Sequence, residues 1–391
     1  MRLTYKYRLF PTSAQRTSLE KVLELCRWVY NDTLAIRKDA YEKAGKGLSL
    51  YDTNKLLTVW KVDKPWLRQV HSQVLQNVQE RVDLAFQAFF RRVRAGEKEA
   101  GYPRFKGKGV YDSFTFKQSG YKLNGAQRAP HLFVSKVGDI AIRLHRPHPG
   151  GSRADAKTLT IQRDAVGNWY ACFSCEVEIK PLAPTHKVVG VDLGLTTFAT
   201  MSDGTKIDRQ RWMKQDAKDI ARLQRKKEAF AKGSTERRKV IRALCHAYER
   251  AANRRKNFAH QESRKLVNEY QFIAFEKLNI QEMQVTGNKV ISRNIADVAW
   301  GQFVQFTTYK AANAGRDVAL VNPRGTTQMC SGCHEIVPKD LSVRLHDCPH
   351  CRLKLHPGAH WAHNAALNIL ARGLASINAG SPDEVVEAQC L

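Results

Sequence analysis

The sequence predicts a multidomain α/β protein in which a small β-barrel, interrupted by helices, precedes a second domain with a mixed sheet. Short apolar segments joined by Gly and Pro predict antiparallel strands in the first half. Long segments with helical spacing follow the first strand, and after residue 184 apolar strands alternate with helices. A chain of 391 residues is long enough for two or three domains.

In the first half, residues 3–10 alternate in polarity, and PTSAQ then opens a helix capped by Thr12 or Ser13. Apolar residues at helical spacing predict helices over residues 19–36 and 70–94. The further strands expected in the barrel are residues 131–134, 139–144, 157–163 and 169–177. The first strand belongs with these strands, so the helices are inserted between parts of one sheet.

The second half begins after the loop at residues 181–184 with KVVGVDLGLTTFATMSDG, which reads as a buried strand, a turn and another strand. The later elements expected are a basic helical region over 211–270, a strand over 272–278, a helix over 295–314 and a strand in RDVALVNP. This alternation predicts a mixed sheet with helices. The acidic, polar tail from Ala379 is expected to be loosely ordered.

Charge is the main compositional signal. Lys and Arg number 64 and Asp and Glu 37, giving a net charge of +27. An excess of this size favours a polyanionic partner, with nucleic acid ahead of an anionic membrane surface. No apolar run is long enough to span a membrane, and the first residues read as a strand, not as a signal peptide. We therefore expect an intracellular, cytoplasmic protein.

The strongest motif is CSGC, a spacer of 14 residues and CPHC, which contains Cys330, Cys333, Cys348 and Cys351. Two Cys-x-x-Cys turns supply the four thiolates of a tetrahedral site, and sulfur ligands favour structural Zn²⁺. His350 is a weaker competing ligand. Four thiolates leave no open position, so the site is expected to be structural and not catalytic.

Two acids follow predicted strands. Asp192 ends the apolar run in VVGVDLG, and Glu276 ends the one in FIAFEKLN. Such residues can be caps or ion-pair partners. Oxygen ligands from two strands of one sheet can also bind Mg²⁺ or Mn²⁺ for phosphodiester cleavage, and the presence of two such ends favours this second interpretation.

Basic and aromatic residues mark candidate nucleic-acid contacts. Bases outnumber acids between residues 206 and 265, which favours a phosphate-binding surface over a merely solvated face. The residues singled out there are Arg222, Arg225, Lys226, Arg254 and Arg255. In YPRFKGKG, Tyr102 and Phe105 stand among Arg104 and Lys106, where the rings either stack on bases or anchor a loop.

The ordered set GYPRFK, GVDLG, NRRKNFAH, FEKLN, CSGC with CPHC, and NAALNIL resembles TnpB, the RNA-guided nuclease of bacterial insertion sequences, which is related to compact type V CRISPR effectors. The resemblance runs from about Arg8 to Arg372. It implies a wedge-type β-barrel with an inserted helical recognition lobe, then a RuvC nuclease domain of RNase H-like fold with a zinc-ribbon insertion. It also implies two partners, a guide RNA and a double-stranded DNA target beside a short motif.

On this resemblance the wedge barrel covers residues 1–11 and 101–183, and the recognition lobe 12–100. The RuvC-like domain covers 184–325 and 353–375, the zinc ribbon 326–352, and the tail 376–391. Asp192 and Glu276 match the first two RuvC carboxylates. A single copy of the chain is expected in the complex with RNA.

The last motif departs from the family. Its pattern there is Asp-Arg-Asp-x-Asn-Ala-Ala-x-Asn-Ile, or the same with His in place of the first Asp. Anchoring on Asn364 puts the first position at His360 and the third catalytic carboxylate at Ala362. His360 and His363 flank this position. The nearest acids lie in the cysteine-rich segment or the tail, and none readily substitutes.

Three functions follow in order of preference. The first is an RNA-guided DNA-binding protein whose cleavage is lost or impaired, acting as a repressor that blocks transcription. The second is an active endonuclease in which His360 or His363 replaces the carboxylate, with Mn²⁺ preferred over Mg²⁺. The third is a transposition accessory factor that binds DNA without a guide RNA.

Overall fold

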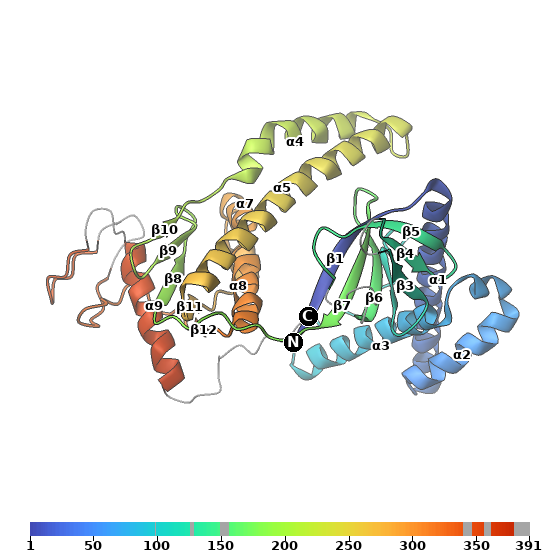
Figure 1. Cartoon of the computed structure of the whole chain (residues 1–391), viewed down its shortest axis with the longest axis horizontal. Helices are drawn as coiled ribbons and strands as arrows, with labels where there is room; N and C mark the ends of the chain where they lie inside the picture. The colour runs from blue at the N-terminus through green and yellow to red at the C-terminus, as the bar shows by residue number, and fades with distance from the viewer. Residues whose placement is uncertain (98, 126–128, 149–155, 339–345, 356–360, 379–391) are drawn as a thin grey trace. The chain divides into compact units, whose positions relative to one another are not determined.

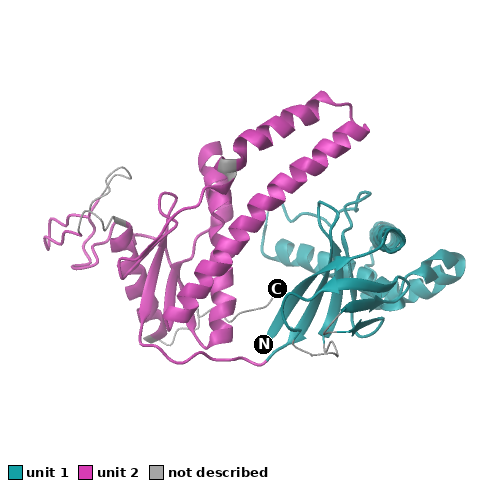
Figure 2. Ribbon diagram, turned by 45° about the horizontal axis from the view of Figure 1, so that its top comes forward, with its two compact units in different colours: residues 1–177 teal, residues 178–391 magenta. Residues whose placement is uncertain are grey.

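The computed structural model describes residues 1–97, 99–125, 129–148, 156–338, 346–355 and 361–378. His360 and the tail beyond residue 378 lie outside these residues. The chain divides into two compact units, Met1–Val177 and Glu178–Leu391 (Figure 2). None of the described helices is both long enough and apolar enough to cross a bilayer.

Unit 1 consists of one sheet and a set of helices inserted after its first strand (Figure 1). The strands are β1 (Arg2–Phe10), β2 (Ser113–Phe116), β3 (Tyr121–Asn124), β4 (His131–Val134), β5 (Gly138–Arg143), β6 (Ala156–Arg163) and β7 (Trp169–Glu176). The helices are α1 (Ser13–Ala44), α2 (Leu50–Asp63), the 3-10 helix η1 (Pro65–Gln69) and α3 (Ser72–Arg94). Thr12 caps α1 in a capping box with Gln15, as the sequence predicts.

The sheet of unit 1 is antiparallel in the order β2-β6-β7-β1-β5-β4-β3. Laid flat, its two outer strands would be about 29 Å apart at 4.8 Å per strand. Only residues 117–120 join β2 to β3, and such a link reaches about 17 Å. The sheet must therefore curl. The side chains close the curl, because Tyr121 on β3 lies 6.1 Å from the Phe116 ring and donates to Ala156 O on β6 at 2.8 Å.

One apolar core joins the helices of unit 1 to the concave face of the sheet. It contains Leu23 and Val29 of α1, Val78 of α3, and Phe114 and Phe173 of the sheet. The apolar stripes predicted on the two long helices are thus core positions. Helix α2 was not predicted, because its apolar residues do not follow one stripe: Leu57 and Trp60 are buried, whereas Tyr51, Val59 and Val62 are exposed.

Unit 2 contains a mixed sheet in the order β10-β9-β8-β11-β12. Its strands are β8 (Val188–Leu193), β9 (Ala199–Met201), β10 (Lys206–Ile207), β11 (Phe272–Glu276) and β12 (Asp317–Val321). Its helices are α4 (Trp212–Ala229), α5 (Thr235–Glu269), α6 (Ile280–Thr286), α7 (Lys289–Val298), α8 (Trp300–Ala314) and α9 (Trp361–Asn378). β8, β11 and β12 are parallel, and β9 and β10 continue the sheet antiparallel.

Alternation along the central strands divides the core of unit 2 between the two faces of the sheet. Ile273 and Phe275 of β11 belong to a core shared with Phe303 of α8. Phe272 and Ala274 belong to a second core that includes Ile369 of α9. Helix α9 therefore covers one face and α8, which packs on α5, covers the other (Figure 1).

Two glycines allow α9 to approach the sheet closely. A Cβ at Gly190 of β8 would lie 2.1 Å from Ala366 O, and one at Gly373 of α9 would lie 2.7 Å from the Cβ of Ala274. Neither distance is sterically possible for a side chain. The backbone of α9 thus rests directly on β8 and β11, and the small residues of NAALNIL belong to this contact.

The helix predicted over residues 295–314 is two helices. Ala299 ends α7 and begins α8 in the left-handed conformation, with a φ of 56°. This conformation is unfavourable for a residue other than glycine, and alanine there provides no sequence signal for the break. The basic region likewise forms two helices, α4 and α5, which pack together as a long hairpin (Figure 1).

Candidate functional site

Asp192 and Glu276 stand side by side at the ends of neighbouring parallel strands. Val191 of β8 pairs with Phe275 of β11, so the next residues, Asp192 and Glu276, share the following position of the ladder. Parallel neighbours lie about 4.8 Å apart and point to the same face. By alternation with Gly190, that face is the one covered by α9. We call these two acids and their surroundings the carboxylate pocket.

The surroundings of the carboxylate pocket disfavour the ionised form of its two acids. Asp192 is 5% exposed, and burial together with the nearby Glu276 raises its pKa to about 8. Burial also raises the pKa of Glu276, while a hydrogen bond from Thr326 and the charge of Arg372 lower it. Among the described residues Asp192 Oδ2 is buried without a hydrogen-bond partner. An orphaned carboxylate oxygen of this kind fits a site for a divalent cation, which would favour the ionised form.

Ala362 and His363 occupy the first turn of α9. Ala362 is one turn before Ala366, on the helix face that packs on β8 and β11, and its methyl group offers no ligand atom. His363 Nε2 lies 3.0 Å from Ser202 O. A carbonyl only accepts, so Nε2 carries the proton, and Nδ1 is buried with no partner in the described part of the chain.

The cysteines of the two Cys-x-x-Cys turns converge as the sequence predicts, and we call them the four-cysteine cluster. Their sulfur atoms all lie within 4.8 Å of one another, with Cys330 and Cys351 3.7 Å apart and Cys333 and Cys348 3.6 Å apart. Zn–S bonds of 2.3 Å in a tetrahedron imply sulfur separations of about 3.8 Å. The four-cysteine cluster is therefore compatible with a structural zinc.

Among residues 1–97, 99–125, 129–148, 156–338, 346–355 and 361–378, this cluster is the sole set of three or more acids, histidines or cysteines whose ligand atoms converge. His363 thus does not join Asp192 and Glu276 in one ligand set in this conformation. His360 lies outside the described residues.

The backbone of the second Cys-x-x-Cys turn favours the thiolate of Cys348, whereas the pKa values of Cys333 and Cys351 are raised. Hydrogen bonds from the backbone N–H groups of Cys351 and His350 lower the pKa of Cys348 to about 6. The expected competitor, His350, has an exposed side chain. The histidine that does approach the sulfurs is the buried His346, whose Nε2 lies 3.3 Å from Cys330 Sγ. Sequence reasoning missed His346, because it lies outside the Cys-x-x-Cys turns.

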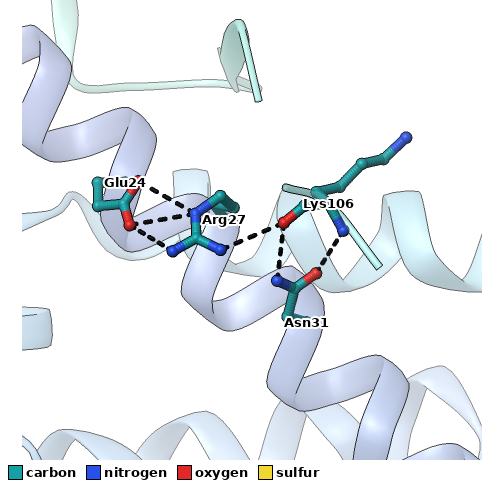
Figure 3. A network of polar contacts seen from close by, with 4 residues as sticks. All are labelled: Glu24, Arg27, Asn31 and Lys106. Atoms are coloured by element: carbon teal, nitrogen blue, oxygen red, sulfur yellow. Dashed lines mark hydrogen bonds and ion pairs between the residues drawn. The ribbon is translucent and has the colours of Figure 1, made fainter. Parts of the chain in front are cut away.

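The segment GYPRFK is held at both ends in unit 1. Asn31 of α1 accepts from Lys106 N at 2.7 Å and donates to Lys106 O at 3.0 Å, and Arg27, itself paired with Glu24, donates to the same carbonyl at 3.2 Å (Figure 3). At the other end Tyr102 makes edge contacts with Phe86 and Phe89 at 5.5 and 5.3 Å. Tyr102 therefore anchors the loop. Phe105 and Arg104, between the anchors, are exposed, and Phe105 is 56% exposed.

The five basic residues singled out on the α4–α5 hairpin fall into two groups. Arg222, Arg225 and Lys226 are exposed on α4, where Arg222 also pairs with the exposed Asp219 at 3.2 Å. Arg254 instead pairs with Asp216 and lies 5.3 Å from the Trp212 ring, and Arg255 pairs with the buried Asp297 at 3.3 Å. Arg254 thus links α5 to α4, and Arg255 links α5 to α7. Sequence reasoning missed this division because the partners lie far away along the chain.

Family comparisons agree with the order of these features. One family model, described as a probable transposase, matches residues 172–286. A model of a Cas12f1-like TNB domain matches residues 300–369, which include the four-cysteine cluster. A helix-turn-helix model matches residues 1–46, although in this chain those residues form β1 and the single long helix α1.

Whole-length comparisons are more specific. The chain is 31% identical, over 96% of its length and 90% of the relative's, to a Streptomyces pristinaespiralis protein named "Putative RNA-guided DNA endonuclease". It is 28% identical, over 96% of its length and 93% of the relative's, to the protein InsQ of Escherichia coli (strain K12), which bears the same description. A solved Cas12f1–guide RNA–target DNA complex matches 94% of this chain and 82% of that chain at a TM-score of 0.60 and 13% identity, a likeness of fold. The chain belongs to the TnpB family of RNA-guided DNA endonucleases.

Proposed function

We propose that the chain is an RNA-guided DNA-binding protein in which DNA cleavage is lost or impaired. The observation that supports this is the carboxylate pocket, where Asp192 and Glu276 meet but the first turn of α9 presents Ala362. Mg²⁺ or Mn²⁺ held by the two acids would polarise a scissile phosphate. With only two carboxylates the cations are incompletely neutralised, and loss of a group that acts in the transition state typically slows a reaction by orders of magnitude.

The same proposal assigns residues 184–325 and 353–375 to a RuvC-like domain and residues 326–352 to a zinc ribbon. Residues 1–11 and 101–183 form the wedge barrel, and 12–100 the recognition lobe. Guide pairing supplies sequence specificity, so the protein needs surfaces that bind backbone and unpaired bases. The exposed bases of α4 suit phosphates, and the exposed Phe105 with Arg104 suits a stacked base. A bound, uncut target would block transcription.

The test uses the purified chain with the RNA that co-purifies, after that RNA has been sequenced. DNA that matches the RNA, carrying a randomised flank, is offered in Mg²⁺ and in Mn²⁺. We expect selection of one flanking motif and stable binding, with cutting at background rates. The absence of a defined RNA, or cutting that Asp192→Ala abolishes, contradicts the proposal.

An active endonuclease is the second candidate, and His363 favours it. A histidine that donates one ring nitrogen to a carbonyl and keeps the other free is arranged as metal-binding histidines are. His363→Ala separates the candidates, because it removes Mn²⁺-dependent cutting only if the imidazole takes the place of the third carboxylate. In the proposed guided binder it leaves target affinity unchanged, as does Ala362→Asp, the variant that adds the carboxylate.

The loop carrying Phe105 has its own test. Phe105→Ala should weaken binding of a fluorescent single-stranded oligonucleotide by about 5- to 150-fold, since one base stack contributes about 1–3 kcal/mol. Phe105→Trp should retain the affinity. Phe10→Ala, at another exposed phenylalanine, is the control. Equal losses in Phe105→Ala and Phe10→Ala would contradict a specific stacking site.

A further inference from the structure

Two asparagines of α9 lie between the four-cysteine cluster and the carboxylate pocket. Asn364 and Asn368 are four residues apart and therefore on the same face of the helix. Both are buried, with exposures of 0% and 1%. Polar side chains this deeply buried need hydrogen bonds, and both find them in the segment that leads into the first Cys-x-x-Cys turn.

Asn364 binds the first turn of the four-cysteine cluster itself. Its Oδ1 accepts from the N–H of Ser331, which lies between Cys330 and Cys333, at 2.9 Å. Its Nδ2 donates to the carbonyl of Met329, the residue before Cys330, at 2.7 Å. The backbone on both sides of the first cysteine is thus tied to α9.

Asn368 continues the connection toward the acids. Its Nδ2 donates to Met329 O at 2.7 Å and to Thr326 O at 2.8 Å, which uses both of its hydrogens. The Thr326 side chain is 1% exposed, and its hydroxyl hydrogen-bonds to Glu276 Oε1. A continuous set of buried hydrogen bonds therefore runs from Ser331 through Asn364, Met329, Asn368 and Thr326 to Glu276.

The end of this set at the cluster has a small core and one short backbone bridge. The apolar group around the cysteines contains Cys330, Val337 and Cys348, with Cys333 and Leu353 beside them. Met329 forms an isolated bridge with Ile336, and Cys330 N donates to Glu335 O at 2.9 Å. Because this bridge closes the turn that carries the first two cysteines, metal binding by those cysteines stabilises Met329 and Ser331 in their places.

We propose that Asn364 and Asn368 are positioning residues that transmit the metal state of the four-cysteine cluster to Glu276 in the carboxylate pocket. Metal loading fixes the first Cys-x-x-Cys turn, the asparagines carry this order to Thr326, and the Thr326 hydroxyl sets the Glu276 carboxylate. Loss of the metal releases Thr326 and leaves Glu276 without its partner. This connection does not depend on whether the carboxylate pocket cleaves DNA. Its test is therefore independent of the test of the proposed function.

Hydrogen exchange of the full chain, zinc-loaded and zinc-stripped, tests the inference. In the wild type, stripping should speed exchange about three- to tenfold in residues 322–329, in the first two turns of α9, and in residues 274–279 around Glu276. The combined Asn364→Ala and Asn368→Ala variant should exchange fast at residues 274–279 even with zinc bound, and stripping should then add nothing there. Asn253→Ala, at an exposed asparagine of α5, should behave as wild type.

Thr326→Val removes the last link, together with the contact of the same hydroxyl to Pro323 O at 2.9 Å, and serves where the asparagine variant does not fold. Stripping should still speed exchange in residues 322–329 and in α9, but no longer at 274–279. The inference is overturned if stripping affects only residues 329–355 in the wild type. It is also overturned if zinc removal and the asparagine substitutions speed exchange at 274–279 additively, because additive effects mean that the two act independently.

Discussion

The four-cysteine cluster and the carboxylate pocket are two candidate ligand sets of unit 2, and they are built in opposite ways. The four cysteines lie within 22 residues of one another in the sequence, and their sulfurs converge at separations suited to zinc. The acids come from strands more than 80 residues apart and meet only because β8 and β11 pair. The first set offers four thiolates, the number that a structural zinc takes, whereas the second offers two carboxylates near Ala362, the position at which the resemblance predicts a third. All ligands of a site built from a local motif can thus be recognised in the sequence. The ligands of a site built from distant strands are brought together only by the pairing of those strands in the sheet.

The largest expected effect comes from removing one thiolate of the four-cysteine cluster. Cys348→Ser removes one of four thiolates, and structural zinc sites contribute about 10–16 kcal/mol of binding free energy in small domains. We expect zinc content to fall from about one per chain to below a tenth. Elemental analysis of the purified protein measures this. Cys245→Ser, at a half-buried cysteine of α5, should retain the metal, and zinc retention by Cys348→Ser would refute the four-thiolate site.

Gly190→Ala disturbs the packing of α9 on β8, which covers the carboxylate pocket. The new Cβ would collide with Ala366 O and Leu370 N, so α9 must lift from β8. Overpacking of this kind costs about 3 kcal/mol. We expect a lower midpoint of urea unfolding for unit 2, with zinc still bound to the four-cysteine cluster. Gly47→Ala, where a Cβ meets nothing within 4 Å, is the matched control, and an unchanged midpoint for Gly190→Ala would contradict the close packing.

Asp192→Asn probes the charge in the pocket. The folded state holds the Asp192 proton up to a pKa of about 8, whereas the unfolded state releases it near pH 4. Between these values folding takes up a proton, so the free energy of unfolding falls as pH rises, by up to about 1.4 kcal/mol per pH unit. Asparagine carries no titrating proton, and the variant should lose this slope and gain stability at pH 7.

Urea midpoints at pH 5.5 and 7.5, without added divalent cations and followed through exchange in β8 and β11, measure the slope. Asp317→Asn, at an exposed acid of β12, should keep the wild-type slope. If Asp192→Asn also keeps it, the burial of a protonated acid is not what limits stability at neutral pH.

The smallest expected effect is that of Thr326→Val on the stability of the pocket. The variant keeps the side-chain shape and loses the hydroxyl that bonds to Glu276. Removing that bond costs about 1 kcal/mol and lets the pKa of Glu276 rise further. The same urea titration should show a steeper fall in stability with pH than in the wild type. A shallower fall would mean that Thr326 does not stabilise the ionised carboxylate.

Sequence patterns predicted most strands and most helices because alternation and helical spacing are local properties. The short strands β2, β3 and β10, of two to four residues, were not predicted. The strands at residues 131–134 and 169–177 are β4 and, to within a residue, β7. Asp192 and Glu276 were found because each ends an apolar strand. Thr326 was not predicted, since nothing near it in the sequence distinguishes it from an ordinary loop residue. His346 lies two residues before Cys348 but outside the Cys-x-x-Cys turn, and was not predicted for that reason.

Other misses depended on partners far along the chain. Arg254 and Arg255 looked like phosphate ligands until the fold supplied Asp216 and Asp297. Tyr102 looked like a stacking residue as much as an anchor until the fold supplied its edge contacts with Phe86 and Phe89, although its side chain stays partly exposed. A charged or aromatic side chain that binds nucleic acid and one that stabilises the fold look the same in the sequence. Only the residues around it in the structure distinguish the two roles.

The position of β1 in the middle of the unit 1 sheet has a consequence for synthesis. β1 lies between β7 and β5, and about 160 residues separate its end from the start of β7. At about 5–20 residues per second a ribosome needs roughly 10–30 s to make that stretch. For most of this time β1 has neither neighbour, because β5 begins only at Gly138, while α1 to α3 have emerged and can pack locally. Unit 1 should therefore complete its sheet late, with the exposed edges of β1 open to misfolding or to chaperones until β7 arrives.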